Sequence, residues 1–276
     1  MKIKKVWSVY FSATTTTEKV VRKIADVAAE KLGAERAEFD FTLPGARADV
    51  LSFGEEDLVI FGTPVYAGRI PNLLLKYVVT VQGNGALAVP VVLYGNRNFD
   101  DALIELRDVL EDGGFHTIAA GAFIGEHSFS TVLGAGRPDA KDMAVVEELG
   151  IKAAESVKKA EAEGIPEPIE VEGVPKPYRG YYQPRDRKGN PIDIRKVKPL
   201  TNENCINCGL CAKVCPMGAI DPADVTSVPG ICIKCCACEK KCPVQAKYYE
   251  DPGYLYHKVE LEEGYTRRAE PVLFTR

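Results

Sequence analysis

Nine cysteines lie in one short segment, and the 204 residues before it contain none. Thiolates in series at this spacing are the ligands of [4Fe-4S] clusters. An odd number of cysteines packed so closely argues against a disulfide framework. Eight of the nine form two runs of identical spacing, Cys205-x2-Cys208-x2-Cys211-x3-Cys215-Pro216 and Cys232-x2-Cys235-x2-Cys238-x3-Cys242-Pro243.

The spacing also predicts how the eight thiolates divide between two clusters. Three thiolates spaced three residues apart reach one cluster, and the fourth, set apart by a turn and a proline, reaches the other. A pair of structural zinc sites is the alternative, although such sites usually pair CxxC units. Cys236 falls outside the register, and we expect a small buried residue there rather than a ligand. The expected ligand sets are Cys205, Cys208, Cys211 and Cys242 for one cluster, and Cys232, Cys235, Cys238 and Cys215 for the other.

A second candidate site begins with a hydroxyl-rich stretch, SATTTT at residues 12–17, between an apolar run and a helical pattern. Hydroxyls and free N–H groups at a helix N-terminus favour an anion. The stretch carries no P-loop lysine, and no GxGxxG follows the first apolar run, so neither ATP hydrolysis nor a dinucleotide is indicated. The remaining interpretation is a monophosphate held by neutral donors, with simple helix capping as the alternative.

Two more polar loops follow apolar runs, at residues 63–69 and 95–100. In an open α/β sheet, ligands bind outside the carboxyl ends of the strands, where these loops and the SATTTT stretch would meet. Tyr66 and Phe99 would then face the two sides of a planar ring, with ordinary packing as the alternative. A later loop, GEHSFS at residues 125–130, is expected to close over the site.

The elements that must position these loops alternate along the first 163 residues. Apolar runs at 6–11, 37–41, 58–61, 86–94 and 116–124 predict five strands, and helical patterns follow at 17–32, 71–81, 99–110 and 139–162. Strands that are apolar throughout suit a parallel sheet covered on both faces. We therefore predict a doubly wound α/β sheet of five parallel strands in the order 2-1-3-4-5.

These motifs carry a resemblance to a known family. Residues 3–130 resemble flavodoxins, with SATTTTE in place of the family's T/S-x-T-G-x-T phosphate loop and Thr15 at its glycine position. With FGTPVYAGRIP, YGNRNFDDAL, GEHSFS and the cysteine runs, the chain resembles the fused flavodoxin–ferredoxin proteins of anaerobes. The resemblance implies FMN and two [4Fe-4S] clusters. It implies that the phosphate is held by Ser12, Thr14, Thr15, Thr16 and Thr17, and the isoalloxazine by Thr63, Pro64, Val65, Tyr66, Ala67, Gly68, Gly95, Asn96, Arg97, Asn98 and Phe99.

The expected organisation is a flavodoxin-like domain at 1–163, a linker at 164–200, a small α+β 2[4Fe-4S] ferredoxin domain at 201–249 and a tail at 250–276. The linker is rich in proline and has no helical period. Between Lys176 and Lys198 it carries eight Lys or Arg and two Asp, which indicates either a docking surface for an acidic partner or a solvated tether. Clusters are expected to stabilise the cysteine domain, because about fifty residues form too small a core.

Composition argues against several other classes of protein. The chain has 276 residues, 46% of them hydrophobic and 27% charged, which suits two folded domains. A net charge of −4 argues against a dedicated nucleic-acid binder. No stretch approaches the roughly 18 apolar residues of a membrane span, and the N-terminal apolar run is too short for a signal peptide. We therefore expect a cytoplasmic protein without membrane insertion.

Together these features predict an electron-transfer flavoprotein that passes electrons between two clusters and FMN, coupling one- and two-electron carriers in anaerobic metabolism. No catalytic residue is expected, since no triad or paired carboxylates are evident. The alternative is a flavin-dependent reductase of a small substrate, fed by the ferredoxin domain. Redox proteins are the expected partners, and a homodimer remains open. Arg69 and Arg97 would stabilise a reduced, anionic flavin, unless Arg97 pairs with Asp100 or Asp101.

Overall fold

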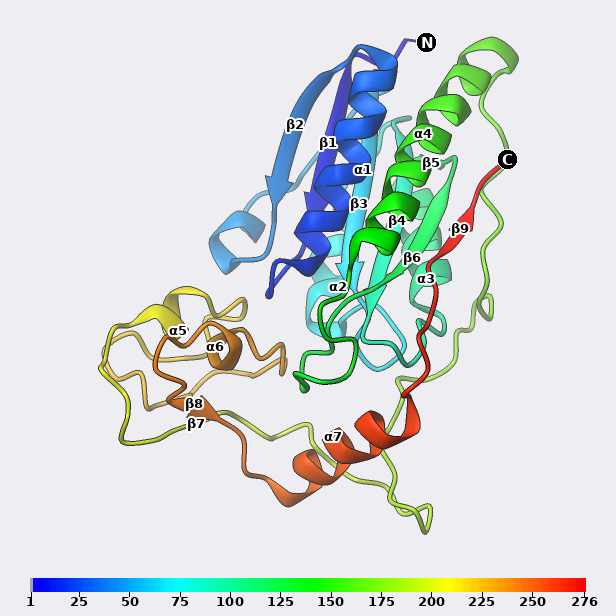
Figure 1. Ribbon diagram of the computed structural model, residues 1–276. Coiled ribbons are helices and arrows are strands. Elements are labelled where there is room, and N and C mark those ends of the chain that lie inside the picture. Colours follow the sequence, from blue (N-terminus) through cyan, green and yellow to red (C-terminus); the bar gives the residue numbers. More distant parts are fainter. Residues whose placement is uncertain (1) are drawn as a thin grey trace.

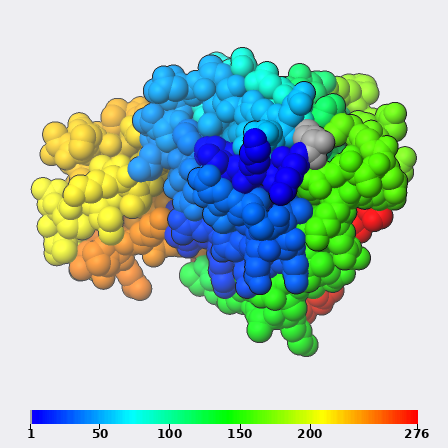
Figure 2. Space-filling model, turned by 90° about the horizontal axis from the view of Figure 1, so that it is seen from above, coloured from blue at the N-terminus to red at the C-terminus, as the bar shows by residue number. Residues whose placement is uncertain are grey.

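The computed structural model describes residues 2–276 and contains one large sheet and a smaller cysteine-bearing lobe (Figure 1). In the space-filling view the lobe projects from one side of the molecule (Figure 2). The helices are α1 (Thr16–Leu32), α2 (Asn72–Val78), α3 (Ala102–Asp112), α4 (Ala140–Glu163), α5 (Leu210–Lys213), α6 (Ala237–Lys240) and α7 (Pro252–Gly264), with a 3-10 turn at Pro44–Arg47. The strands are β1 (Lys5–Tyr10), β2 (Glu35–Asp40), β3 (Asp57–Pro64), β4 (Leu87–Tyr94), β5 (His116–Thr117), β6 (Ala120–Ile124), β7 (Leu200–Thr201), β8 (Lys247–Tyr248) and β9 (Val272–Phe274).

The large sheet has the strand order β2-β1-β3-β4-β6-β9. β1 to β6 are parallel, and β5 and β6 pair with successive parts of β4, so that they act together as a fifth strand interrupted at residues 118–119. Every residue of β4 is buried, as its unbroken apolar sequence predicts. The predicted flavodoxin-like, doubly wound sheet with order 2-1-3-4-5 is confirmed.

Helices cover both faces of this sheet (Figure 1). α1 and α4 pack on one face through Val20, Ile24, Val146 and Leu149. α2 and α3 pack on the other face, where Leu74 and Leu106 join the second core cluster. Each parallel strand therefore ends at the same edge of the sheet, and the loops that follow β1, β3, β4 and β6 meet there.

The tail returns to the sheet, which the sequence did not predict. β9 adds an antiparallel edge strand, with Ala122 opposite Val272 and Ala120 opposite Phe274. α7 bridges the gap between the cysteine-bearing lobe and this strand (Figure 1). The chain therefore leaves the sheet after α4 and re-enters it at β9, so the lobe is attached to the sheet at both ends.

The linker is extended, as expected, but it lies against the sheet domain instead of hanging free. The backbone N–H of Ile169 donates to Thr117 O at 3.1 Å, and that of Tyr182 donates to Ala67 O at 2.8 Å. Its basic residues pair within the chain: Lys176 lies 2.5 Å from Asp112, and Arg187 lies 2.8 Å from Glu260. Part of the basic charge of the linker is thus neutralised by carboxylates of this chain.

The cysteine-bearing lobe contains little regular secondary structure. β7 and β8 pair antiparallel, Leu200 opposite Tyr248, and bring the two ends of the lobe together. α5 and α6 are single turns that each carry the third cysteine of a run. Nowhere in residues 2–276 is a helix both long and apolar enough to span a bilayer.

Candidate functional site

The loop between β1 and α1 presents free backbone N–H groups. The backbone N–H groups of residues 13–17 donate to no acceptor within residues 2–276. The Ser12 hydroxyl accepts from Glu18 N at 3.0 Å, and Ser12 N donates to Thr42 Oγ1 at 2.7 Å, which fixes the start of the loop. Free N–H groups at the N-terminus of a 17-residue helix attract a phosphate group.

Thr15 gives this loop the conformation that a glycine would adopt most easily. Its φ is 67°, in the left-handed region, although threonine is β-branched. Its side chain is exposed and its hydroxyl donates to Thr14 O at 2.6 Å. The loop therefore turns as a glycine-containing one would, at a cost in backbone strain.

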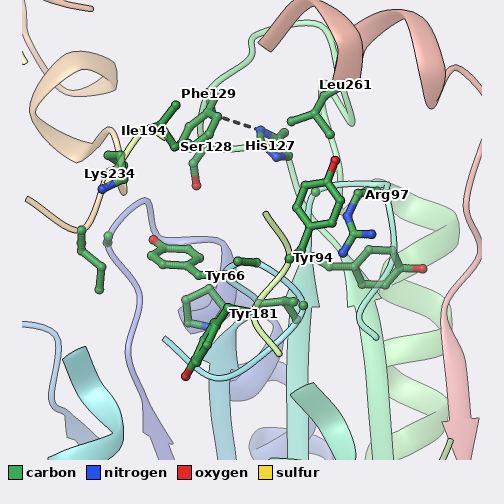
Figure 3. A pocket seen from close by; sticks show the side chains of 18 of the residues that line it. Tyr66, Tyr94, Arg97, His127, Ser128, Phe129, Tyr181, Ile194, Lys234 and Leu261 are labelled. Carbon is green, nitrogen blue, oxygen red and sulfur yellow. Dashed lines mark hydrogen bonds between the residues drawn. The ribbon is translucent and has the colours of Figure 1, made fainter. Parts of the chain in front are cut away.

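A cavity of about 630 Å³ lies at the carboxyl ends of the parallel strands, next to this loop (Figure 3). Its size is typical of a site for a small molecule or cofactor. Loops after β1, β3, β4 and β6 contribute to its wall, as the switch-point argument predicts. Twelve of the expected flavin-site residues line it: Ser12, Thr14, Thr16, Thr17, Pro64, Val65, Tyr66, Ala67, Gly68, Gly95, Arg97 and Asn98.

The other four expected flavin-site residues lie off the wall of this cavity. Thr15 points to solvent, and Thr63 is fully buried within β3, where its hydroxyl has no hydrogen-bond partner in the described chain. Phe99 is 6% exposed and packs on Tyr94, with ring centroids 5.7 Å apart. Tyr94, at the end of β4, is therefore the aromatic ring that faces the cavity in place of Phe99.

Asn96 connects the loop after β4 to the tail. Its amide nitrogen donates to Tyr265 O at 2.8 Å and to Arg267 O at 2.7 Å, and its amide oxygen accepts from Ala269 N at 3.1 Å. The amide nitrogen and the amide oxygen of Asn96 thus both bond to backbone groups of the tail. Asn96 thus fixes the tail to the cavity loop and does not contact the cavity.

The two arginines expected near a flavin are paired with carboxylates. Arg69 forms a bidentate pair with Glu105, at 2.8 and 2.5 Å, and does not line the cavity. Arg97 does line it, but its guanidinium pairs with Asp100 and lies 4.5 Å over the Tyr182 ring. The structure therefore has the alternative arrangement, in which Arg97 pairs with Asp100.

The loop at 125–130 closes one side of the cavity, where Glu126, His127, Ser128 and Phe129 line it. Phe129 N donates to His127 Nδ1 at 3.1 Å. Lys240 of the cysteine-bearing lobe donates to Glu126 Oε1 at 2.5 Å and to the carbonyls of His127 and Ser130 at 2.8 and 3.0 Å. These bonds fix the lobe to the cavity loop.

Several lining residues come from segments that the sequence did not assign to the site. The linker supplies Tyr181, Tyr182 and Ile194, the lobe supplies Cys232 and Lys234, and α7 supplies His257 and Leu261. The only sequence signal was the adjacent tyrosine pair at 181–182, which is unusual in a segment otherwise rich in charge and proline. The other lining residues reach the cavity through contacts between segments far apart in the chain.

The second cysteine run gathers around a small cavity of about 20 Å³. Its wall includes all four cysteines predicted for one cluster, namely Cys215, Cys232, Cys235 and Cys238, and also Cys236. Burial, and then the neighbouring Cys232 and Cys215 thiols, raise the pKa of Cys235 to about 12. The last cysteine of the first run therefore lies beside the second run.

Backbone N–H groups point at cysteine sulfurs in both runs. Ala219 N lies 3.2 Å from Cys215 Sγ, and Ala246 N lies 3.2 Å from Cys242 Sγ, at equivalent places. N–H donors of this kind stabilise thiolates, and they are among the features that set cluster potentials. Cys205 and Cys211 pack together against Ile220 and Val225, and Cys208 is exposed. The N–H groups that point at Cys215 and Cys242 thus suit thiolate ligands.

Cys236 has a different environment from the eight cysteines in register. It is 1% exposed, and its sulfur lies 3.4 Å from the Tyr254 hydroxyl of α7. Burial raises the pKa of its thiol well above the ordinary value, so it stays protonated. The residue packs the lobe against α7.

The large and the small cavity share a wall. Cys232 and Ile233 line both of them. Tyr66 lies at the same junction, where burial, and then the thiols of Cys235 and Cys236, raise its pKa well above the ordinary value for tyrosine. Cys235 and Ala237 pack into the core cluster of the sheet domain. The second cysteine run is thus in direct contact with the candidate flavin site.

Comparisons with known proteins give matches for two parts of the chain. Residues 199–221, with Cys205, Cys208, Cys211 and Cys215, match the 4Fe-4S binding domain family. No curated protein matches the sequence. The large domain is similar to a flavodoxin from the domain Archaea (16% identity, 56% of this chain and 99% of that chain, TM-score 0.40). It is also similar to the Streptococcus pneumonia TIGR4 flavodoxin (18%, 55% and 98%, 0.39) and to a Fusobacterium nucleatum flavodoxin variant bound to flavin mononucleotide (14%, 59% and 98%, 0.37).

The strand order and the family match describe the two main parts of the chain. The chain joins a flavodoxin-like α/β domain to a C-terminal 4Fe-4S-binding segment. The expected resemblance to a fused flavodoxin and ferredoxin is confirmed at this level.

Proposed function

We propose that this protein transfers electrons between FMN and two [4Fe-4S] clusters held in one chain. The observation that supports this best is the shared wall of the two cavities, formed by Cys232 and Ile233. Electron transfer weakens steeply with distance, so a flavin and a cluster held in cavities that share these wall residues would exchange electrons readily. The cavity thereby provides a route from the flavin site into the second cysteine run.

The residues of the large cavity fit FMN. The unpaired N–H groups of residues 13–17 bind the phosphate, and Tyr66 and Tyr94 supply flat surfaces for a planar ring. Bound FMN supplies one- and two-electron chemistry, while thiolate-bound clusters take one electron at a time. Linker residues Tyr181 and Tyr182 cover the cavity and limit the access of water to it.

Two features of this chain support the proposal of a second cluster. The second run repeats the spacing of the first, and Cys215 of the first run lies with Cys232, Cys235 and Cys238 around one small cavity. We therefore assign one cluster to those four thiolates and the other to Cys205, Cys208, Cys211 and Cys242.

The two runs then have different roles. None of Cys205, Cys208 and Cys211 lines the large cavity, and Cys208 is exposed. The first run is therefore the side that an external redox protein in the cytoplasm would approach, and the second run connects it to the flavin. A one-electron redox protein therefore meets the chain at one end of this route, and the flavin site lies at the other end.

Anaerobic purification and reconstitution, followed by flavin and iron analysis, test this proposal. We expect one FMN and about eight irons per chain, with EPR signals of reduced [4Fe-4S] clusters. FAD in place of FMN, or about four irons after complete reconstitution, would contradict it. A Cys208→Ser variant should lose only the cluster of the first run and keep FMN, which makes it a control for general unfolding.

A further inference from the structure

One end of the large cavity is built by segments that the five-stranded sheet does not supply. His257 of α7 and Tyr182 of the linker line it. Leu261 of α7, Arg97 and His127 lie beside them on the wall (Figure 3). The Tyr182 ring lies 5.9 Å from the His257 ring and under the Arg97 guanidinium. These side chains form one cluster, which we call the α7 end of the cavity.

His257 has a mostly buried ring whose nitrogens have no partner in the described chain but remain accessible from the cavity. It is 6% exposed, and within residues 2–276 neither of its ring nitrogens forms a hydrogen bond. Its ring packs edge-on against Phe129, with centroids 6.3 Å apart. The ring nitrogens of His257 are therefore free to bond to a ligand in the cavity.

His127 presents a second free N–H group at the same place. Its Nδ1 accepts from Phe129 N, so the neutral ring carries its proton on Nε2, which has no acceptor among the described residues. Burial, and then the positive charges nearby, lower the pKa of His127 to about 3 and that of His257 to about 4. Both rings are therefore neutral at pH 7, and each offers one N–H donor.

The surroundings define what these donors recognise. Arg97 is already paired with Asp100, so the α7 end offers little net charge to an anion. Phe129 and Tyr182 provide flat apolar surfaces, which favour a planar ring. Neutral N–H donors beside aromatic faces suit the carbonyl oxygens of such a ring.

We propose that the α7 end of the cavity binds the carbonyl edge of a planar ring, with His257 and His127 as its hydrogen-bond donors. Two sources have this chemistry. One is the isoalloxazine of FMN, in which case the inference rests on the proposed function. The other is a planar dicarbonyl compound that enters beside the flavin.

The test compares His257→Leu with His257→Gln in the cluster-loaded full chain, with His116→Leu as the matched control. His116 lies on β5 and does not line the cavity. FMN affinity is measured by quenching of FMN fluorescence, and 1,4-naphthoquinone affinity by calorimetry on the oxidised protein. Loss of one hydrogen bond predicts an affinity about tenfold lower in His257→Leu. His257→Gln keeps a donor and should recover most of it.

The pattern of losses identifies the source. A loss confined to FMN assigns the α7 end to the isoalloxazine, and a loss confined to 1,4-naphthoquinone assigns it to a second planar compound. Unchanged affinity for both, or equal losses in His257→Leu and His116→Leu, would overturn the inference. So would a His257→Gln variant as weak as His257→Leu, because packing would then explain the loss. A wild-type chain that fails to bind FMN contradicts the proposed function, while the naphthoquinone measurement still decides the inference.

Discussion

Asn96 allows the attachment of the tail to be tested by one substitution. Asn96→Ala removes three hydrogen bonds and leaves the carbonyls of Tyr265 and Arg267 and the N–H of Ala269 without partners. Asn96 is 4% exposed and Ala269 is 2% exposed, so water replaces these bonds poorly. At roughly 1 kcal/mol for each bond, the loss amounts to about 3 kcal/mol.

The backbone conformation of residue 96 also makes Asn96→Ala less stable, and a control variant allows this second effect to be subtracted. Asn96 has φ 66°, a region that alanine enters at a cost of about 1–2 kcal/mol. Asn84 has φ 47°, and its amide donates to Ser52 Oγ and Phe53 O at an exposed position. Asn84→Ala therefore incurs the backbone cost with little loss from buried bonds, and the difference between the variants isolates the tail attachment.

Urea unfolding followed by circular dichroism gives the free energy of each variant. We expect Asn96→Ala to be less stable than Asn84→Ala by about 2–3 kcal/mol. Trypsin should also cut faster after Arg267 and Arg268 in Asn96→Ala, because the tail is released. Equal stability and equal cleavage rates in the two variants would refute the role of Asn96 as the attachment point.

Three more predictions concern other parts of the chain. Thr15→Gly relieves the strain of a β-branched residue at φ 67°, so it should stabilise the protein by about 1 kcal/mol and leave the FMN affinity unchanged. The control Thr14→Gly changes a residue without positive φ and should not stabilise the protein. A hydrogen bond from Arg179 lowers the Asp101 pKa to about 2 from 3.8, so its stabilising effect is present above pH 4 and is lost as the pH falls toward 2. Urea unfolding of Asp101→Asn should therefore show a weaker pH dependence between pH 4 and 2 than wild type, and an identical one would contradict this. Cys215→Ala should damage the cluster on Cys232, Cys235 and Cys238, as seen by Mössbauer spectroscopy; loss of the Cys205 cluster instead would show that the ligands do not cross.

Local sequence was sufficient to predict the parts of the fold that local patterns determine. The uninterrupted apolar runs at 58–61 and 86–94 correctly predicted buried parallel strands, because burial on both faces removes polar alternation. The hydroxyl-rich stretch at 12–17 correctly predicted the start of a helix. The first cysteine run predicted a 4Fe-4S segment, because cluster ligation requires a fixed spacing.

The missed features depend on contacts between distant parts of the chain. Asn96 was assigned to the flavin because it follows β4, but its partners lie 169 to 173 residues later. β9 has only three residues, too few for a periodic pattern, and is held by pairing with β6. His257 shows no functional signal in α7, because only the docking of that helix brings its ring to the cavity.

The central claim is that the flavin and the second cysteine run exchange electrons within one chain. Flash reduction of the clusters, followed by the flavin absorbance, tests it most directly. We expect flavin reduction at a rate that stays constant over a tenfold range of protein concentration in wild type, and a much slower rate in Cys232→Ser with FMN still bound. A rate that rises in proportion to protein concentration, or one that is unchanged in Cys232→Ser, would contradict the account.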